Sequence, residues 1–244
     1  NRQFTSSARD QLAQKVDLLI VVGGDGSFIN AAHSAVKHNT PVLGVNRGRL
    51  GFLTDIHPQD LEKKIGEVLN GNYQEEKRFL LNAAITMQLD KQQAGIALNE
   101  VVLMPGNVAR MIEFSIMIDD QFVCAQQADG LIVATPTGST AYAFSAGGPV
   151  IWPSVEALVV VPISAHALFA KPLVVDTKSV IAIEVPQDGA NGHLTADGRR
   201  AFDLSPGMRI EVKKSNSYVH LARLGNESFS QRLVKKFQLP VEGW

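Results

Sequence analysis

Cysteine is almost absent from this sequence, which has 244 residues and only Cys124. A single cysteine excludes an intramolecular disulfide and favours a reducing compartment, so we expect a cytoplasmic protein. Long hydrophobic runs are also missing, since none approaches the roughly 18 residues that a membrane-spanning helix needs. The net charge is −1, and no cluster of lysine and arginine marks a basic patch. We therefore expect neither a membrane nor a nucleic acid as partner.

The common motifs for metals and phosphates are absent as well. The six histidines show no spacing typical of a metal site, so we assign no metal-binding residue. The lysine-containing phosphate loop, G-x-x-x-x-G-K-[ST], occurs nowhere, and the dinucleotide pattern G-x-G-x-x-G fails because Ile29 replaces its third glycine. Any phosphate chemistry must therefore use a different arrangement.

The first third of the chain alternates between strand and helix patterns. Residues 18–22 (LLIVV) and 41–46 (PVLGVN) are continuous apolar runs, as expected for strands that are covered on both faces. Residues 27–38 have helical periodicity, and Pro58 opens a second helix. This alternation predicts a parallel, Rossmann-like α/β domain over residues 1–79.

After this domain the chain breaks into short β-rich segments separated by turn residues. Residues 118–121 (IDDQ), 187–192 (QDGANG) and 196–199 (ADGR) look like hairpin connections. We therefore predict an all-β, sandwich-like C-terminal domain over residues 80–225.

Two polar or helical segments flank this second domain. The run EEKR, residues 75–78, precedes it, and we expect it to be a solvated connection. The tail, residues 226–244, has a helical pattern over 228–237 with its apolar residues on one side. We expect this helix to pack back on the first domain.

A turn of three glycines and one aspartate, Gly23 to Gly26, ends the first apolar run. Ligands of open α/β sheets bind at this end of a strand, and the following helix N-terminus favours an anion. Asp25 would repel a bare phosphate, so it suits a site with a cation, or with a hydroxyl that it orients and deprotonates. A plain strand-to-helix connection, with Asp25 as the N-cap, explains the turn equally well.

Two further stretches combine polar groups with an apolar setting. Residues 128–150 carry several hydroxyl side chains among glycines and offer neutral donors to ribose, phosphate or amide groups; a serine- and threonine-rich series of turns is the alternative. Asn99 and Glu100 interrupt an apolar run, where they could bind an adenine edge and a ribose hydroxyl. Taken alone, this pair fits better with one side chain in solvent and the other capping a turn.

Together and in this order, these stretches resemble the bacterial type of NAD kinase. The matching pieces are GGDG (23–26), NRGRLGFLTD (46–55), NE (99–100), DGLIVATPTGSTAY (129–142) with SAGGP (145–149), and ADG (196–198). GGDG alone also occurs in diacylglycerol-type lipid kinases and phosphofructokinase-like enzymes, but the whole combination is highly specific. The family usually has a strand, a helix and a further strand before GGDG, so we expect part of the first domain to lie outside this sequence.

The resemblance implies transfer of the γ-phosphoryl group of ATP to the 2′-hydroxyl of the adenosine ribose of NAD, which gives NADP. Asp25 would be the catalytic carboxylate, and a homo-oligomer, dimer or tetramer, would share its active sites between subunits. The implied dinucleotide contacts are Asp25, Gly26, Asn99, Glu100, Asp129, Thr137, Thr140, Ala141, Tyr142, Ala143, Phe144 and Ser145, with Arg110, Gln127 and Arg199 at positions where relatives contact the ligand.

The chemistry also predicts a metal cofactor. Since no phosphate-loop lysine is present to neutralise the triphosphate of the donor ATP, we expect Mg²⁺ or Mn²⁺ to do so. Two other functions stay open: a lipid kinase of the diacylglycerol type that shares GGDG, and a non-catalytic NAD sensor that binds NAD without releasing ADP.

Overall fold

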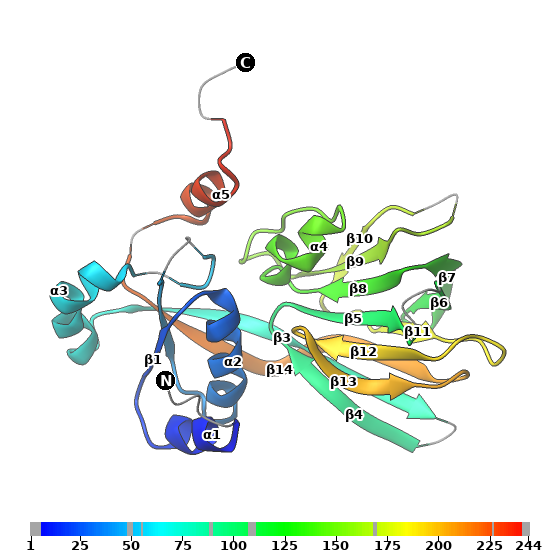
Figure 1. The fold of residues 1–244 in the computed structure, drawn as a ribbon, viewed down its shortest axis with the longest axis horizontal. Coiled ribbons are helices and arrows are strands. Elements are labelled where there is room, and N and C mark those ends of the chain that lie inside the picture. The colour runs from blue at the N-terminus through cyan, green and yellow to red at the C-terminus, as the bar shows by residue number, and fades with distance from the viewer. Residues whose placement is uncertain are drawn as a thin grey trace. The chain divides into compact units, whose positions relative to one another are not determined.

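The computed structural model describes residues 6–47, 51–54, 56–87, 90–106, 111–167, 170–225 and 227–240. The chain divides into two compact units, of which unit 1 contains residues 1–78 and 217–244 and unit 2 contains residues 79–216 (Figure 1). Two strands, β3 (Gln74–Met87) and β14 (Arg209–Arg223), each run along the chain from one unit into the other. Residues 217–225, which the sequence assigns to the second domain, group with unit 1.

Unit 1 is built from helices around a small parallel sheet. Strand β1 pairs with β2 in parallel, and Leu221 of β14 pairs with Val42 of β2, also in parallel. The predicted parallel α/β arrangement is therefore confirmed. Its elements are α1 (Ser6–Gln14), β1 (Leu19–Val22), α2 (Asp25–Ala35), a 3₁₀ turn (Val36–His38), β2 (Val42–Val45), α3 (Pro58–Leu69) and α5 (Phe229–Phe237).

The two parallel strands differ in burial. All of β2 is buried, as predicted, but the expectation that β1 is covered on both faces is wrong. Ile20 and Val22 are 41% and 56% exposed, whereas Leu19 and Val21 on the other face are partly covered. Among the described strands β1 pairs only with β2, so it lies at an edge of the sheet. An apolar sequence favours a strand, but other elements decide whether its second face is covered.

The helices of unit 1 begin where local sequence predicts. Pro58 opens α3, and Gly71 follows its end with φ +70°, a conformation that glycine adopts without strain. The N-cap of α2 is Gly24 rather than Asp25, so the proposed capping role of Asp25 is wrong. Within the described residues, no helix combines the length and apolar character needed to cross a membrane.

Helix α5 has a complete capping box at its N-terminus. The backbone N–H of Gln231 donates to the Ser228 hydroxyl, and the Gln231 side chain accepts from the Ser228 N–H. This cap places Phe229 and Phe237 on the face of the helix that packs on Phe52, with ring centroids 5.6 and 5.9 Å from that of Phe52. The C-terminal helix therefore contacts the first domain, on a segment that follows β2.

Unit 2 consists of two packed antiparallel sheets. One contains the order β14-β11-β6-β7 together with β3 and β4, and the other has the order β10-β9-β8-β5-β12-β13. The predicted sandwich-like, all-β architecture is confirmed. Its remaining strands are β4 (Asp90–Ala97), β5 (Glu100–Pro105), β6 (Ile112–Ile118), β7 (Gln121–Ala128), β8 (Gly130–Ala134), β9 (Ala157–Ile163), β10 (Leu173–Asp176), β11 (Ile181–Glu184), β12 (Gly192–Ala196) and β13 (Arg199–Leu204).

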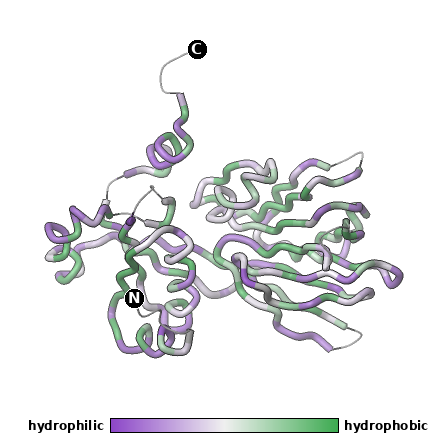
Figure 2. Tube along the Cα trace, in the orientation of Figure 1, coloured by the Kyte–Doolittle hydropathy of each residue, from purple (hydrophilic) through white to green (hydrophobic). Residues whose placement is uncertain are grey.

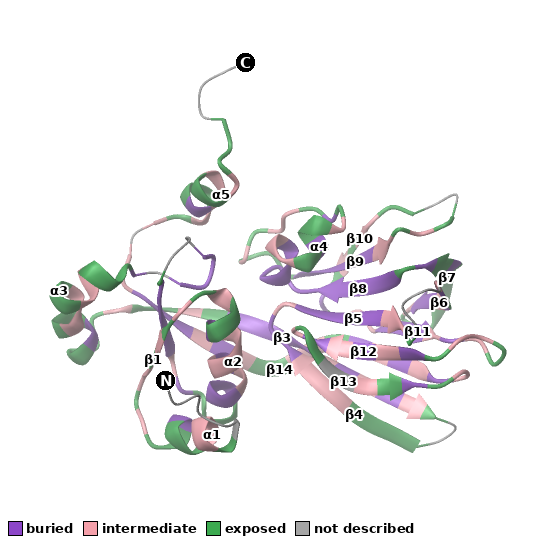
Figure 3. Cartoon of the chain, viewed as in Figure 1, coloured by how far each residue is buried: buried purple, intermediate pink, exposed green. Residues whose placement is uncertain are grey.

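The core of unit 2 follows the hydrophobic strands. Figure 2 shows hydrophobic residues along the strands of this unit, and Figure 3 shows that β5 and β8 are largely buried whereas much of β4 is exposed. One helical turn, α4 (Tyr142–Ser145), follows a 3₁₀ turn (Gly138–Thr140) and rests on this core. Ala143 of α4 is fully buried against Val102, Ile132 and Val161.

Two of the three predicted hairpins are confirmed. Asp119 and Asp120 connect β6 and β7 with φ of 52° and 61°, and Asp197 and Gly198 connect β12 and β13 with φ of 50° and 70°. Positive φ at both central residues is the geometry of a tight two-residue hairpin. The third prediction is wrong, because residues 187–192 connect β11 in one sheet to β12 in the other. Turn-forming residues do not reveal which sheet the chain enters next.

Candidate functional site

Asp25 is the first residue of α2, and its carboxylate is held by a neighbouring loop. The backbone N–H groups of Phe52 and Leu53 donate to its Oδ2 and Oδ1 at 2.9 and 3.0 Å. We call residues 51–54 the amide loop. A carboxylate offers about four lone-pair positions, so the two amides leave others for a hydroxyl or a cation. The side chain is only partly exposed, and its direction is fixed by both oxygens.

Gly51 allows the amide loop to approach Asp25 so closely. A Cβ atom at this position would lie 2.1 Å from Asp25 Oδ1 and 2.7 Å from Thr54 Oγ1. Gly26, by contrast, is exposed, and a Cβ there would meet nothing within 4 Å. The surface beside Asp25 is therefore open at Gly26 and tightly packed at Gly51. The sequence marks the glycine-rich stretch 46–55 but indicates no role for Gly51, Phe52 or Leu53.

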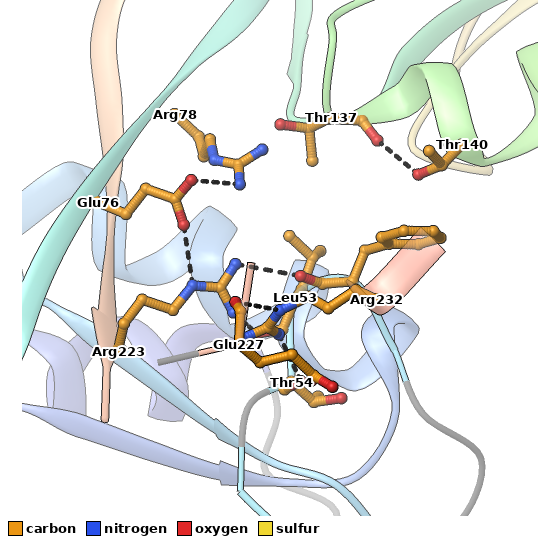
Figure 4. A network of polar contacts seen from close by, with 10 residues as sticks. Leu53, Thr54, Glu76, Arg78, Thr137, Thr140, Arg223, Glu227 and Arg232 are labelled. Atoms are coloured by element: carbon orange, nitrogen blue, oxygen red, sulfur yellow. Dashed lines mark hydrogen bonds and ion pairs between the residues drawn. The ribbon is translucent and has the colours of Figure 1, made fainter. Parts of the chain in front are cut away.

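The carbonyl groups of the amide loop are bound by two buried arginines (Figure 4). Arg223 donates to the Phe52 oxygen at 3.1 Å and to the Leu53 oxygen at 3.5 Å, the second being the weaker contact. Arg232 of α5 donates to the Thr54 oxygen at 3.2 Å. Both arginine residues are more than nine-tenths buried and belong to unit 1, so the loop is held by side chains of its own unit.

Glu76 and Arg78 of β3 complete this network. Arg223 Nε donates to Glu76 at 2.8 Å, and Arg78 donates to the other oxygen of the same carboxylate. Burial opposes ionisation of Glu76, but the attraction of Arg78 and Arg223 outweighs it and lowers its pKa. Burial, together with the charges of Arg223 and Arg232, lowers the pKa of Arg78 to about 10. The expectation that residues 75–78 form a solvated connection is therefore wrong for these two side chains.

In unit 2, Asp197 holds the backbone of the Asn99–Glu100 pair. Its Oδ2 accepts from the N–H of Leu98 at 2.7 Å, and its Oδ1 accepts from the N–H of Asn99 at 2.8 Å and of Glu100 at 3.3 Å. Asp197 can do so because it sits in the left-handed turn between β12 and β13. The sequence marks this ADG turn but indicates no role for Asp197 on its own. The only available signal was the turn-forming pair Asp197–Gly198.

The threonine-rich segment packs against the other side of the same pair. Thr135 donates its hydroxyl to the Leu98 oxygen at 2.6 Å and accepts from the Gly138 N–H at 3.1 Å. A Cβ at Gly138 would lie 2.2 Å from the Asn99 oxygen, so only glycine fits there. The order of hydroxyls and glycines in this stretch thus has a local structural reason as well as any role in binding.

Glu100 is a buried carboxyl group next to another acid. Its residue is 8% exposed, which contradicts the alternative that it faces solvent. Burial, and then the negative charge of Asp197, raise its pKa to about 8, while an N–H from Tyr142 acts in the opposite direction. Glu100 Oε2 and Asn99 Oδ1 are both shielded from solvent and have no hydrogen-bond partner among the described residues. Buried polar atoms without partners cost about 1–3 kcal/mol each and indicate a missing ligand or water.

The other predicted contact residues fall into separate groups. Thr137 is buried, Thr140 and Ala141 are half-buried, and Tyr142, Phe144 and Ser145 are exposed. Because the Ala143 side chain belongs to the core, only its backbone is available to a ligand. Arg199 is exposed at the start of β13, directly after the Asp197–Gly198 turn. The predicted contact at Arg110 lies outside the described residues.

Gln127 and Asp129 are not next to the Asn99–Glu100 pair. Both are exposed and precede β8, whereas Glu100 pairs with Ala134 at the far end of that strand. A strand of five residues covers about 16 Å. The two sets of predicted residues therefore lie at opposite ends of one strand of unit 2.

No group of three or more His, Cys, Asp or Glu side chains that could hold a metal ion occurs in the part of the chain that the structure describes. Asp25 is the predicted site residue whose carboxylate is both fixed in direction and partly exposed. Mg²⁺ in phosphoryl-transfer sites is commonly bound by one or two carboxylates together with substrate phosphates. A single carboxylate therefore fits an ion that arrives with a nucleotide.

Comparisons with known proteins give a consistent result. The family model described as the ATP-NAD kinase N-terminal domain matches residues 2–73, and the one described as the C-terminal domain matches residues 98–224. The NAD kinase of Coxiella burnetii (strain RSA 493 / Nine Mile phase I) is 47% identical over 237 residues, which are 97% of this chain and 79% of the relative. The NAD kinase of Pseudomonas entomophila (strain L48) is 52% identical over 217 residues, 88% of this chain and 73% of the relative.

Solved structures agree with these sequence relatives. The yeast NADH kinase complexed with NADH superposes with a TM-score of 0.86 at 27% identity, covering 97% of this chain and 70% of that one. The NAD kinase from Archaeoglobus fulgidus in complex with ATP gives a TM-score of 0.78 at 27% identity, covering 98% and 88%. Both units of the fold are therefore found together in these structures.

Proposed function

This chain belongs to the ATP-NAD kinase family, and from this premise we propose that Asp25 prepares the 2′-hydroxyl of the adenosine ribose of NAD for phosphorylation by ATP. The enzyme phosphorylates NAD to NADP. The relatives are NAD kinases, and neither a lipid kinase nor a non-catalytic sensor is favoured beside them.

The observation that carries the proposal is the fixed direction of the Asp25 carboxylate. A secondary hydroxyl is a poor nucleophile until it is oriented and relieved of its proton. Phosphoryl transfer needs little covalent help, so positioning and charge neutralisation dominate the rate. Asp25, held by the amides of Phe52 and Leu53, can orient the hydroxyl and accept its proton through its remaining lone pairs.

We assign the adenosine part of NAD to Asn99 and Glu100. Their unpaired buried oxygens need donors, and the adenine amino group and the ribose hydroxyls supply them. With a pKa of about 8, Glu100 is largely protonated near neutral pH and can also donate. The further contacts we propose are Gly26, Arg110, Gln127, Asp129, Thr137, Thr140, Ala141, Tyr142, the backbone of Ala143, Phe144, Ser145 and Arg199.

A divalent cation, Mg²⁺ or Mn²⁺, fits this arrangement as a companion of ATP. Asp25 is the carboxylate we assign to it, with the remaining ligands from phosphates and water. When bound, the ion neutralises charge on the phosphates. Asp25 and the amide loop keep the acceptor side of the reaction in place.

The separation of predicted contacts supports a shared active site. Gln127 and Asp129 lie at the opposite end of β8 from Asn99 and Glu100. We propose that the protein forms a homo-oligomer, a dimer or a tetramer. In it, one active site would combine Asn99 and Glu100 of one subunit with Gln127 and Asp129 of another. We also propose that the enzyme acts in the cytoplasm, because a chain with a single cysteine, Cys124, suits a reducing compartment.

The test replaces Asp25 by asparagine, which has nearly the same shape but is no base. We expect NADP formation to fall by about 10³-fold or more, as loss of a positioned base typically costs 10²–10⁴-fold, with the Kd for NAD within about threefold. Wild-type enzyme should also stop in excess chelator and recover with Mg²⁺. Equal losses of turnover and NAD binding in Asp25→Asn would refute the catalytic role of Asp25. Full wild-type activity in excess chelator would refute the need for a cation. Phosphorylation of diacylglycerol in place of NAD would support the lipid-kinase alternative.

A further inference from the structure

The amide loop has its two sides bound by opposite charges. On one side its N–H groups donate to the Asp25 carboxylate, and on the other its carbonyls accept from Arg223 and Arg232. Asp25 and Arg223 thus bind the same short piece of backbone. None of the catalytic roles assigned above includes Arg223.

One peptide unit connects these two side chains directly. The carbonyl of Phe52 and the N–H of Leu53 belong to the same planar amide. The carbonyl accepts from Arg223 at 3.1 Å, and the N–H donates to Asp25 at 3.0 Å. A cation on the oxygen of an amide polarises it and strengthens its N–H as a donor. Arg223 thus acts on Asp25 through the Phe52–Leu53 peptide.

We propose that Arg223 is a positioning residue for the kinase reaction, which fixes the Asp25 carboxylate through the Phe52–Leu53 peptide. The inference rests on the proposed role of Asp25. Glu76 supports it, since its carboxylate accepts from Arg223 Nε at 2.8 Å and orients the guanidinium. The Phe52 ring supports it as well, because Phe229 and Phe237 of α5 pack on it and prevent the loop from turning.

Arg232 provides an internal comparison. It is as buried as Arg223 and also donates to a carbonyl of the amide loop, that of Thr54. The Thr54 carbonyl shares its peptide with residue 55, so it is not in the same amide as either donor to Asp25. If polarisation of one specific peptide matters, the two arginines differ in their effect on rate.

The experiment is a double-mutant cycle on NADP formation with Arg223→Lys and Asp25→Asn. Lysine keeps the positive charge but cannot bind Glu76 and the Phe52 carbonyl with one planar fork. We expect Arg223→Lys to lower kcat by about tenfold or more, since hydrogen bonds to charged groups are worth this much, and to leave the KM for NAD within about twofold. In the Asp25→Asn background the same change should lower kcat by less than about threefold, because its target is gone.

Three controls make the result specific. Arg232→Lys should cost less kcat than Arg223→Lys. Arg209→Lys, on the same strand but paired with Glu184 and Asp120 in unit 2, should leave kcat unchanged. The Leu53 amide proton should move upfield in the NMR spectrum of Arg223→Lys, while amides of β2 keep their shifts. If Arg223→Lys fails to fold, Arg223→Gln, which retains one NH2 donor group without the charge, enters the same cycle.

The outcomes separate this inference from the proposed function. Equal losses from Arg223→Lys in both backgrounds, or a wild-type kcat, would overturn the positioning role. Parallel losses of kcat, NAD affinity and thermal stability would also overturn it, because they describe a purely structural arginine. A wild-type kcat in Asp25→Asn would instead refute the role of Asp25 itself.

Discussion

Gly51→Ala is the substitution that tests the packing around Asp25 most sharply. The added Cβ would lie 2.1 Å from Asp25 Oδ1 and 2.7 Å from both Asp25 Cγ and Thr54 Oγ1, so the carboxylate must move by about 1 Å to restore normal contact. Such a shift breaks or lengthens both amide hydrogen bonds of Asp25. Bonds of this kind contribute about 1.5–3 kcal/mol each. Loss of one to two of them in the reacting geometry predicts a kcat lower by about 10²-fold or more.

The matched control for Gly51→Ala is Gly66→Ala. Gly66 lies within α3, and a Cβ there would meet nothing within 4 Å. Alanine is the better helix former, so this control should keep full activity and gain about 0.5–1 kcal/mol of stability. The assay is NADP formation at saturating NAD and ATP, with thermal unfolding measured in parallel. A Gly51→Ala enzyme with wild-type kcat would refute the packing argument, and so would one whose activity loss is explained by unfolding.

Two further predictions concern unit 2. Burial and the charge of Asp197 raise the pKa of Glu100 from 4.5 in the unfolded chain to about 8 in the folded protein. Between these two pH values the folded protein keeps the Glu100 proton and the unfolded chain has lost it. The free energy of unfolding is therefore unaffected by Glu100 ionisation at low pH and falls as the pH rises from about 4.5 to 8. Glu100→Gln cannot ionise, so its free energy of unfolding relative to wild type should increase steadily up to pH 8, by the order of a few kcal/mol. Denaturant titrations at several pH values measure this difference. A difference in unfolding free energy that does not change with pH would contradict the assigned pKa. Gly138→Ala places a Cβ 2.2 Å from the backbone oxygen of Asn99, which cannot rotate away as a side chain could. We therefore expect the free energy of unfolding to fall by about 2–3 kcal/mol and NAD binding, measured by calorimetry, to weaken. An unchanged Kd for NAD would contradict this contact.

Local signals in the sequence predict the elements that carry the site. The apolar run before GGDG predicts β1, Pro58 predicts the start of α3, and the Asp119–Asp120 and Asp197–Gly198 pairs predict tight hairpins, as the structure confirms. Each depends on residues within one turn or one strand. The exposure of β1 and the passage of residues 187–192 between two sheets depend instead on distant packing, and no short pattern encodes either.

The supporting residues of the site escaped prediction for the same reason. Arg223 lies 171 residues from Phe52 in the sequence, and Arg232 lies 178 residues from Thr54. In the sequence each is an ordinary basic residue in a strand or helix with other charged neighbours. Asp197 binds the start of β5 from 97 to 99 residues away, and only its turn was recognisable. The chemistry of a motif can be read locally, whereas the groups that fix its direction come from the folded chain.

The central claim, that the Asp25 carboxylate receives the ribose hydroxyl, is tested most directly by a crystal structure of the wild-type enzyme with bound NAD. We predict a distance of about 2.6–3.2 Å between an Asp25 carboxylate oxygen and the 2′-oxygen of the adenosine ribose, with the Phe52 and Leu53 amides still donating to Asp25. An Asp25 side chain turned away from that oxygen, with no ion or water between them, would contradict the account.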